Sequence, residues 1–299
     1  MFLGGKSEVS IHLNPKLLSS AKISLLIGSG ANGNLFPQLA GFTNTINKIK
    51  EVLGVEEVDA NKIEATISSL KEDKRQDVLE AFKNEIQTFN NKVDFSNSSH
   101  DNIYSLLLEL DKLIQFEENR TFRTKQVNIF TLNYDTIFEK ILNNSGLFYN
   151  VLEPSNIKKK SYLYSLIGQD YITKKYKTTF LISKIHGNVS EPILPGLAKF
   201  DELIAEKYFE ILFNMKGTLK QPNSVLFVIG YSGNDEHINQ AIVDCIDSGL
   251  TIFWFRYDVK SSVPLDLQNK IIIIDQPNDI PEDTTKILAD GLKKLWENR

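Results

Sequence analysis

An amide and a carboxylate side chain stand two residues apart where an apolar stretch of the sequence ends. Residues 127–132 form a short run rich in strand-forming residues, and Asn133, Tyr134 and Asp135 follow it directly. In an open α/β sheet, ligands bind outside the carboxyl ends of the strands, so both polar side chains would face that space. Asn133 and Asp135 are therefore candidate catalytic residues. Alternatively, Asn133 could hold a turn and Asp135 could cap the helix expected at residues 137–142.

A histidine stands at a comparable position further along the chain. Residues 178–185 alternate as in a strand, and His186-Gly187 follows where that strand should end. A lone histidine is more often a structural group than a catalyst. At a strand end and directly before a glycine, however, its ring can reach a ligand, so His186 is the third catalytic candidate.

Two glycine-containing loops also follow predicted strands. After the strand at residues 23–27, the segment GSGANG at 28–33 matches G-x-G-x-x-G, in which backbone N–H groups can approach a pyrophosphate. The usual dinucleotide motif opens a helix directly and meets an acidic residue at the end of the next strand. Here residues 34–37 intervene and no second strand follows at that distance. The spacing therefore does not fit a standard dehydrogenase.

The second loop follows the strand at residues 225–229. Its Gly230 and Gly233 allow close backbone approach, and Ser232 offers a hydroxyl. Asp235 is expected to cap the helix that runs through Ile246. For Asp235, helix capping is a stronger hypothesis than a catalytic role.

The remaining pattern predicts an α/β fold, a Rossmann-like parallel sheet with helices on both faces and an inserted helical layer. The helical layer is expected at about residues 38–120, where apolar residues recur at helical spacing without any proline. We interpret residues 1–299 as a single domain that carries this helical insertion. Strands are expected at residues 23–27, 127–132, 178–185, 225–229, 251–255 and 271–274, and further helices at about 199–220 and 281–296.

Lysines and tyrosines alternate between residues 147 and 176. Basic residues interleaved with aromatic residues can grip a phosphate or stack on a base. An exposed hairpin whose edges are protected by lysine accounts for the pattern more simply. The residues concerned are Lys158, Lys159, Lys160, Lys174, Lys175, Tyr162, Tyr164, Tyr171 and Tyr176.

The composition is that of an ordinary globular chain. The 299 residues include 34 basic and 38 acidic side chains, for a net charge of -4, which gives no strong signal for nucleic-acid binding. The single cysteine, Cys245, excludes an intramolecular disulfide and a zinc site of several thiolates, and its apolar setting predicts a buried thiol. No segment has the length of a membrane span and no signal peptide is evident, so a cytoplasmic location is expected.

Four motifs in this order resemble the sirtuin superfamily, and its bacterial sirtuin-like NADase branch more closely than the protein-deacetylating sirtuins. The matching residues are Gly28-Ser29-Gly30 for the family's Gly-Ala-Gly loop, Asn133 and Asp135 for its Asn-x-Asp element, His186-Gly187 for its His-Gly pair, and Gly230-Tyr231-Ser232 for its late Gly-x-Ser loop. The resemblance implies that NAD is the substrate. It also implies that the glycine loops bind it, with the diphosphate at the first loop and the adenosine side at Ser232. The implied NAD-binding residues are Gly28, Ser29, Gly30, Asn32, Gly187, Gly230 and Ser232.

By the same resemblance, Asn133 and Asp135 line the nicotinamide and ribose pocket, and His186 is a general base toward a ribose hydroxyl or water. These roles suit cleavage of the nicotinamide–ribose bond, because its oxocarbenium-like centre needs fixed dipoles nearby and a base active near neutrality. No metal is required. One departure from the family is the lack of a four-cysteine zinc module after the His-Gly pair, which argues against an acetyl-lysine substrate. Another is Phe36-Pro37-Gln38 in place of the sirtuin Pro-Asp-Phe-Arg.

The expected function is therefore hydrolysis of NAD to nicotinamide and ADP-ribose. Sirtuin-like domains of this type deplete NAD in bacterial antiphage systems that work by abortive infection. Because constant NADase activity would kill the host, we expect control by a homo-oligomeric switch, a regulatory partner protein or a nucleotide signal. The alternatives are a non-catalytic NAD or nucleotide sensor and an ADP-ribosyltransferase. The presence of both Asn133 and His186 favours chemistry over sensing.

Overall fold

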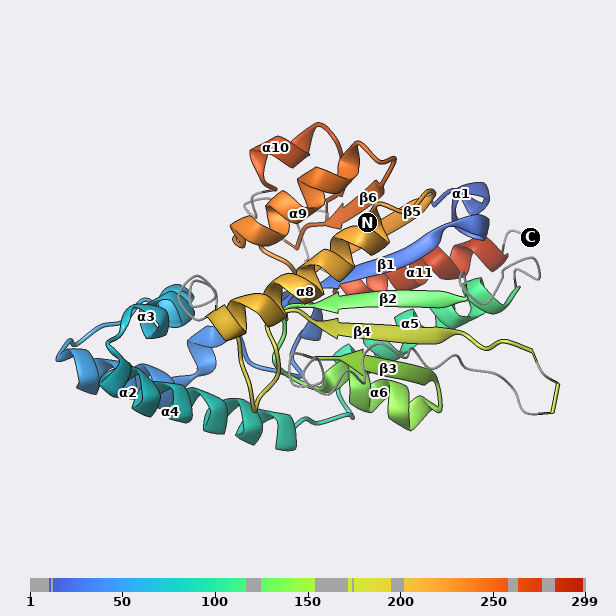
Figure 1. The fold of residues 1–299 in the computed structure, drawn as a ribbon. Coiled ribbons are helices and arrows are strands. Elements are labelled where there is room, and N and C mark those ends of the chain that lie inside the picture. Colours follow the sequence, from blue (N-terminus) through green and yellow to red (C-terminus); the bar gives the residue numbers. More distant parts are fainter. Residues whose placement is uncertain are drawn as a thin grey trace, which may run out of the picture.

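A seven-stranded parallel sheet forms the centre of the molecule (Figure 1). The computed structural model describes residues 11, 13–116, 125–153, 172–173, 175–194, 202–257, 263–275 and 283–297. The strands are β1 (Lys22–Ile27), β2 (Gln126–Thr131), β3 (Phe148–Leu152), β4 (Thr179–Lys184), β5 (Ser224–Ile229), β6 (Thr251–Phe255) and β7 (Ile272–Ile274). All of the predicted strands are present, and β3 is additional.

The strands lie in the order β3-β4-β2-β1-β5-β6-β7, and each neighbouring pair is parallel. From β1 the chain first places β2, β3 and β4 on one side of β1, with β3 at the edge of the sheet, and then returns to place β5 on the other side. In such sheets the ligand site lies at this switch, outside the carboxyl ends of the strands. For this chain the switch lies between β1 and β5.

Helices cover both faces of the sheet. On one face, α1 (Pro15–Ser20), α5 (Ser98–Phe116), α6 (Ile137–Ser145) and α11 (Thr284–Glu297) pack in the apolar cluster that contains Leu25 of β1. On the other face, α8 (Glu202–Leu219), α9 (Glu236–Ile246) and α10 (Leu265–Gln268) pack in the cluster that contains the neighbouring Leu26. Successive side chains of a strand point to opposite faces, so the central strands must be apolar throughout. The predicted α/β class with helices on both faces is confirmed.

Three helices between β1 and β2 lie beyond the carboxyl ends of the strands. They are α2 (Thr43–Leu53), α3 (Ile63–Ser69) and α4 (Glu72–Asn91), together with the short 3-10 turns η1 (Ser29–Asn32), η2 (Leu39–Gly41) and η3 (Ala60–Lys62). Figure 1 shows these three helices on the side toward which the arrowheads of β2 and β4 point. We call α2, α3 and α4 the cap helices. In contrast, α5 follows them in the sequence but packs on the sheet beside α11.

The edge strand β3 corrects the hairpin prediction for its first residues. Phe148–Leu152 pairs in parallel with β4, directly after α6 ends at Gly146 in the left-handed conformation. Its side chains are only partly buried or exposed, so the segment lacks the apolar pattern of the central strands. The lysine and tyrosine cluster from Lys158 to Tyr171, and Lys174, lie outside the described residues.

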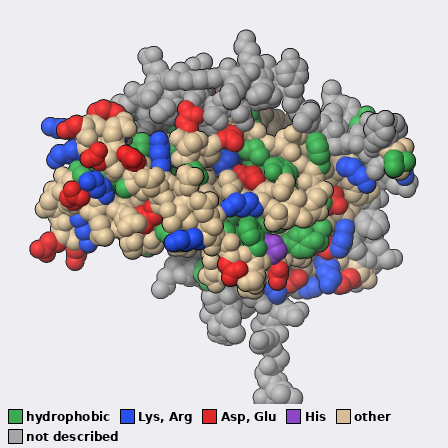
Figure 2. Space-filling model, turned by 90° about the horizontal axis from the view of Figure 1, so that it is seen from below, with side chains coloured by type: hydrophobic (Ala, Val, Ile, Leu, Met, Phe, Trp, Pro, Cys, Tyr) green, Lys and Arg blue, Asp and Glu red, His purple; other side chains and the backbone are tan. Residues whose placement is uncertain are grey.

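The surface of the described residues carries mixed charges. On the face seen in Figure 2, basic and acidic side chains are interspersed rather than separated into areas of one sign. None of the described helices combines the length and apolar character needed to cross a bilayer. The buried Cys245 sits inside α9 as predicted, and burial raises the pKa of its thiol.

Candidate functional site

The four predicted motifs come together at one end of four adjacent strands. The pairing of β2 with β4 ends at Thr131 and Lys184. Asn133 and His186 each follow two residues later, so they stand at equivalent positions on neighbouring strands. The glycine loops continue β1 and β5, whose pairing ends at Ile27 and Ile229. All the predicted site residues thus lie at the carboxyl edge of β4, β2, β1 and β5.

The two glycine loops contact each other through their backbones. A Cβ atom on Gly28 would lie 2.4 Å from the oxygen of Gly230, and one on Gly230 would lie 2.0 Å from the nitrogen of Ala31. Gly230 also has a φ of +64°, which side chains rarely allow. The N–H groups of Gly28 and Gly30 donate to the oxygens of Ile229 and Gly230, at 3.0 Å each. These two amides therefore join the loops, while Ser29 and Ser232 are exposed to solvent.

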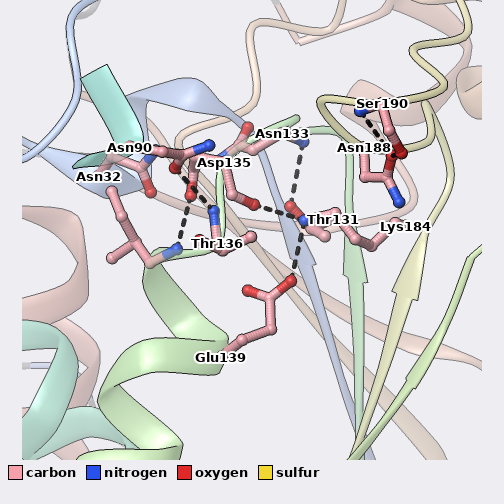
Figure 3. A network of polar contacts seen from close by, with 11 residues as sticks. Asn32, Asn90, Thr131, Asn133, Asp135, Thr136, Glu139, Lys184, Asn188 and Ser190 are labelled. Atoms are coloured by element: carbon pink, nitrogen blue, oxygen red, sulfur yellow. Dashed lines mark hydrogen bonds and ion pairs between the residues drawn. The ribbon is translucent and has the colours of Figure 1, made fainter. Parts of the chain in front are cut away.

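Asn133 ties the end of β2 to the first glycine loop. Its side-chain Nδ2 donates to the main-chain oxygen of Gly28 at 3.2 Å. Its own N–H donates to Thr131 Oγ1 at 3.1 Å (Figure 3). The residue is buried, and its amide oxygen has no hydrogen-bond partner among the described residues. The amide is thus fixed from the nitrogen side, and its oxygen remains available for a ligand.

Asp135 is buried and uses both carboxylate oxygens. Oδ2 accepts a hydrogen bond from Asn32 Nδ2 at 2.6 Å, and Oδ1 accepts one from the N–H of Ile137 at 3.0 Å. The second bond satisfies the first N–H of α6, although the N-cap position is occupied by Thr136 and not by Asp135. Burial raises the pKa of Asp135, although Lys184 and the hydrogen bonds from Ile137 and Asn32 oppose the shift.

Asn32 carries a buried polar atom that finds no partner in the described part of the chain. None of the described residues donates a hydrogen bond to its Oδ1, although Asn32 is only 1% exposed. A buried acceptor without a donor is costly, and it commonly marks a place where a ligand or an ordered water completes the bonding. Asn32 lies in η1, directly beside the first glycine loop, and its other amide atom holds Asp135.

Lys184, the last residue of β4, anchors the residues that follow β2. Its ammonium group is buried and donates to the main-chain oxygen of Asp135 and to Glu139 Oε1, the latter at 3.0 Å (Figure 3). The sequence showed Lys184 only as a polar position in an alternating strand. Its role could not be inferred from the sequence, because both faces of the sheet are covered by helices. In addition, its partners Asp135 and Glu139 follow a different strand, β2.

His186 is held by a carboxylate and two aromatic rings. Its Nε2 lies 3.0 Å from Asp235 Oδ2, and only 6% of the residue is exposed. The ring of Tyr208 is stacked at 6.3 Å between centroids, and that of Tyr134 lies at 6.4 Å. Burial works to raise the pKa of Asp235, but the hydrogen bond and charge of His186 outweigh it and keep that pKa below its usual value. The sequence did not predict the pairing of His186 with Asp235.

The predicted capping role of Asp235 is confirmed at the same time. Its Oδ1 accepts hydrogen bonds from the N–H groups of His237 at 3.0 Å and Ile238 at 3.2 Å, at the start of α9. Gly187 has a conformational role beside His186. Its φ is +74°, and a Cβ atom there would lie 2.2 Å from the oxygen of Glu191, so the tight turn after β4 requires glycine.

The cap helices also hold the residues that follow β2. The hydroxyl of Tyr134 donates to Glu64 Oε1 of α3 at 2.6 Å, and Asn90 Oδ1 of α4 accepts from the N–H of Thr136 at 3.1 Å. Burial, followed by the charge of Glu64, raises the pKa of Tyr134 well above its usual value, so the phenol stays protonated. Residues far apart in sequence thus fix the positions of Asn133 and Asp135 between them.

The described residues contain no group of three or more His, Cys, Asp or Glu side chains arranged to hold a metal ion. The titratable groups that do converge are the His186–Asp235 pair and the buried Asp135. An imidazole with a carboxylate behind it can accept a proton from a bound hydroxyl or water. A fixed amide beside it can stabilise a developing positive centre.

Comparison with known proteins finds a matching family model for part of the chain. The family model for the SIR2-like domain matches residues 127–270, which include Asn133, His186 and the second glycine loop. No curated protein matches the sequence significantly. Among solved structures, 71 chains match. One, described as "Structural Basis for the Mechanism and Regulation of Sir2 Enzymes", has a TM-score of 0.48 and 11% identity over 95% of this chain and 96% of that chain. Over residues 127–270 the chain is thus similar to the SIR2-like domain family.

Proposed function

We propose that the protein is an NAD+ glycohydrolase that cleaves NAD to nicotinamide and ADP-ribose, with the whole chain acting as one NAD-binding domain. The observation that carries the proposal is the placement of Asn133 and His186 at equivalent positions on neighbouring strands, beside the glycine loops of β1 and β5. Both side chains are buried, and each is held by a hydrogen bond, that of Asn133 to the main-chain oxygen of Gly28 and that of His186 to Asp235. Such pre-ordered polar groups at a strand end are the expected equipment of a catalytic site.

Each step of the hydrolysis has a candidate residue. The bond between the nicotinamide nitrogen and the ribose carbon breaks, and its electron pair leaves with nicotinamide. The positive ribose carbon is stabilised by the fixed dipole of Asn133, whose amide oxygen is available, and by the nearby carboxyl group of Asp135. A water molecule adds its oxygen to that carbon, and His186 accepts the proton that the water loses.

The residues around this pair fit NAD as a substrate. The unpaired Oδ1 of Asn32 offers a buried acceptor for a donor on the ligand. Ser29 and Ser232 are exposed at the edges of the two loops and can donate to phosphate or ribose oxygens. Because the amides of Gly28 and Gly30 already bond to the loop after β5, we assign the diphosphate contacts to Ser29 rather than to these glycine amides.

The test is NAD consumption with product identification by the purified chain. Wild type should release nicotinamide and free ADP-ribose, and Asn133→Ala should abolish release while the far-ultraviolet spectrum stays native. The matched control is Asn143→Ala, the same change at an exposed position of α6. His186→Ala should also remove turnover but can retain NAD binding. NAD binding without turnover would indicate a sensor, and label transferred to a macromolecule would indicate an ADP-ribosyltransferase.

We further propose that the activity serves antiphage defence by abortive infection. The resemblance to bacterial sirtuin-like NADases supports this role, and it implies that a partner protein, an oligomeric switch or a nucleotide signal controls the enzyme. The consumption assay should therefore be repeated with lysate from phage-infected bacteria. Turnover that depends on the infected lysate, and not on an uninfected one, would support a controlled effector.

A further inference from the structure

Asp235 holds two structural elements with one carboxylate. Oδ1 accepts from two N–H groups at the start of α9, while Oδ2 lies 3.0 Å from His186 Nε2. The hydroxyl of Tyr231 donates to the main-chain oxygen of Asp235 at 3.0 Å and accepts from its N–H at 3.1 Å. Tyr231 thus holds the main chain of Asp235 and the start of α9 holds its Oδ1, so contacts other than His186 fix this residue.

The surroundings of His186 leave Asp235 as its only ionic partner among the described residues. The rings of Tyr134 and Tyr208 lie 6.4 Å and 6.3 Å from the imidazole between centroids, and burial raises the pKa of each phenol well above its usual value, so both stay neutral. Glu64 is bound to the hydroxyl of Tyr134, and His237 packs against Tyr208 at 6.2 Å between ring centroids. The edge of the imidazole that carries Nε2 therefore meets a carboxylate that remains ionised.

We propose that Asp235 is a positioning residue that fixes the catalytic tautomer of His186. An ionised carboxylate only accepts hydrogen bonds, so Nε2 must carry the proton and Nδ1 must be the basic nitrogen. The proton lost by the attacking water then goes to Nδ1, and the carboxylate stabilises the resulting imidazolium without taking a proton itself. This inference rests on the proposed hydrolase function for its kinetic part but not for its structural part.

The variant Asp235→Asn separates the two roles of the side chain, which are to cap α9 and to fix the tautomer of His186. Asparagine caps helices as well as aspartate does, so α9 keeps its start and the variant should fold. The amide nitrogen that faces His186, however, can only donate, and the imidazole must turn to the other tautomer with its proton on Nδ1. We expect kcat to fall by roughly 10²- to 10⁴-fold, by analogy with carboxylate-to-amide changes behind a catalytic histidine, with KM little changed.

The matched control is Asp94→Asn. Asp94 is exposed and also accepts a main-chain N–H two residues later, that of Ser96 at 2.9 Å, but it lies on the loop after α4. The turnover of the Asp94→Asn variant should equal that of the wild type. If Asp235→Asn retained full turnover while wild type hydrolysed NAD, or if KM rose and kcat stayed constant, the positioning role would be wrong.

A second measurement tests the tautomer without any turnover. The chain has four histidines, so ¹⁵N spectra of the ring nitrogens are simple, and the His186→Gln variant identifies the relevant signals. Wild type should show the proton on Nε2 and Asp235→Asn should show it on Nδ1. The same tautomer in both proteins would overturn the inference. If the tautomer switches but no preparation hydrolyses NAD, then the positioning holds and the proposed hydrolase function fails.

Discussion

The buried ammonium group of Lys184 donates a hydrogen bond to the main-chain oxygen of Asp135, and so joins the end of β4 to the residues after β2. The same group forms an ion pair with Glu139 of α6 at 3.0 Å, where the two side chains are 1% and 13% exposed. One cation thus holds both the turn that carries Asn133 and Asp135 and the helix that follows it. Lys184 therefore supports the turn that carries Asn133 and Asp135.

Lys184→Met should destabilise the protein strongly. Removing one partner of a buried ion pair leaves the other charge without compensation, which typically costs roughly 3–5 kcal/mol in the free energy of unfolding. Adding Glu139→Gln should recover part of the loss, because it removes the unpaired carboxylate. Urea denaturation of the two single variants and the double variant gives the coupling energy. A loss below about 1 kcal/mol for Lys184→Met, the range of exposed pairs, would show that the pair does not hold the turn.

Gly230→Ala should separate the two glycine loops. The new Cβ atom would lie 2.0 Å from the nitrogen of Ala31, and the residue would keep a φ of +64°. We expect a loss of roughly 3 kcal/mol or more in the free energy of unfolding, together with weaker NAD binding by calorimetry.

The matched control for this change is Gly249→Ala. Gly249 also has a positive φ, of +85°, but no atom lies within 4 Å of a Cβ atom built there. It isolates the cost of the left-handed backbone, about 1–2 kcal/mol. Equal losses in the two variants would mean that loop contact contributes nothing at Gly230.

The sequence predicted which residues of the candidate site follow the strands better than it predicted the contacts that these residues make. Buried parallel strands are continuous apolar runs, so the positions after them, Asn133 and His186, could be found from the sequence alone. The pairing of His186 with Asp235 could not, because it depends on how the loop after β5 crosses toward β4. Likewise, Glu64 reaches Tyr134 only because the cap helices fold back over the strand ends. Spacing along the chain carries no signal for such contacts.

The missed strand β3 and the dual role of Asp135 have separate physical causes. An edge strand has one unpaired side and half-exposed residues, so Phe148–Leu152 shows neither alternation nor a continuous apolar run. For Asp135, capping and site formation were treated as alternatives. A carboxylate has two oxygens, and in the structure one accepts from the N–H of Ile137 at the start of α6 and the other from Asn32.

Asp135→Asn should stabilise the protein at neutral pH while impairing turnover. Burial raises the pKa of Asp135 above its usual value of 3.8, so folding favours the protonated form. The stabilisation from that form is complete below the unfolded pKa and is lost as pH rises through the higher folded pKa. The neutral amide avoids this loss, keeps an oxygen for the N–H of Ile137, and can bond to Asn32 if that amide turns over.

Denaturation by urea at several pH values tests the sign of this difference in stability between Asp135→Asn and wild type. The variant should be more stable than wild type at pH 7, and the difference should shrink as pH falls toward 3.8. A variant less stable than wild type at pH 7 would indicate that the attraction of Lys184 for the ionised carboxylate dominates over burial. Loss of NAD turnover without loss of stability would mark Asp135 as a site where function opposes stability.

Tyr134→Phe should show whether the cap helices control the candidate catalytic residues. The change removes the hydroxyl that donates to Glu64 at 2.6 Å but leaves the ring against Phe82, at 5.5 Å between centroids, and beside His186. We expect a loss of about 1–2 kcal/mol in stability and a lower kcat, because Asn133 precedes Tyr134 directly and moves with it. Glu64→Gln and the double variant complete a cycle that measures the coupling between α3 and the turn after β2. Additive effects on kcat in this cycle would mean that α3 covers the site without positioning it.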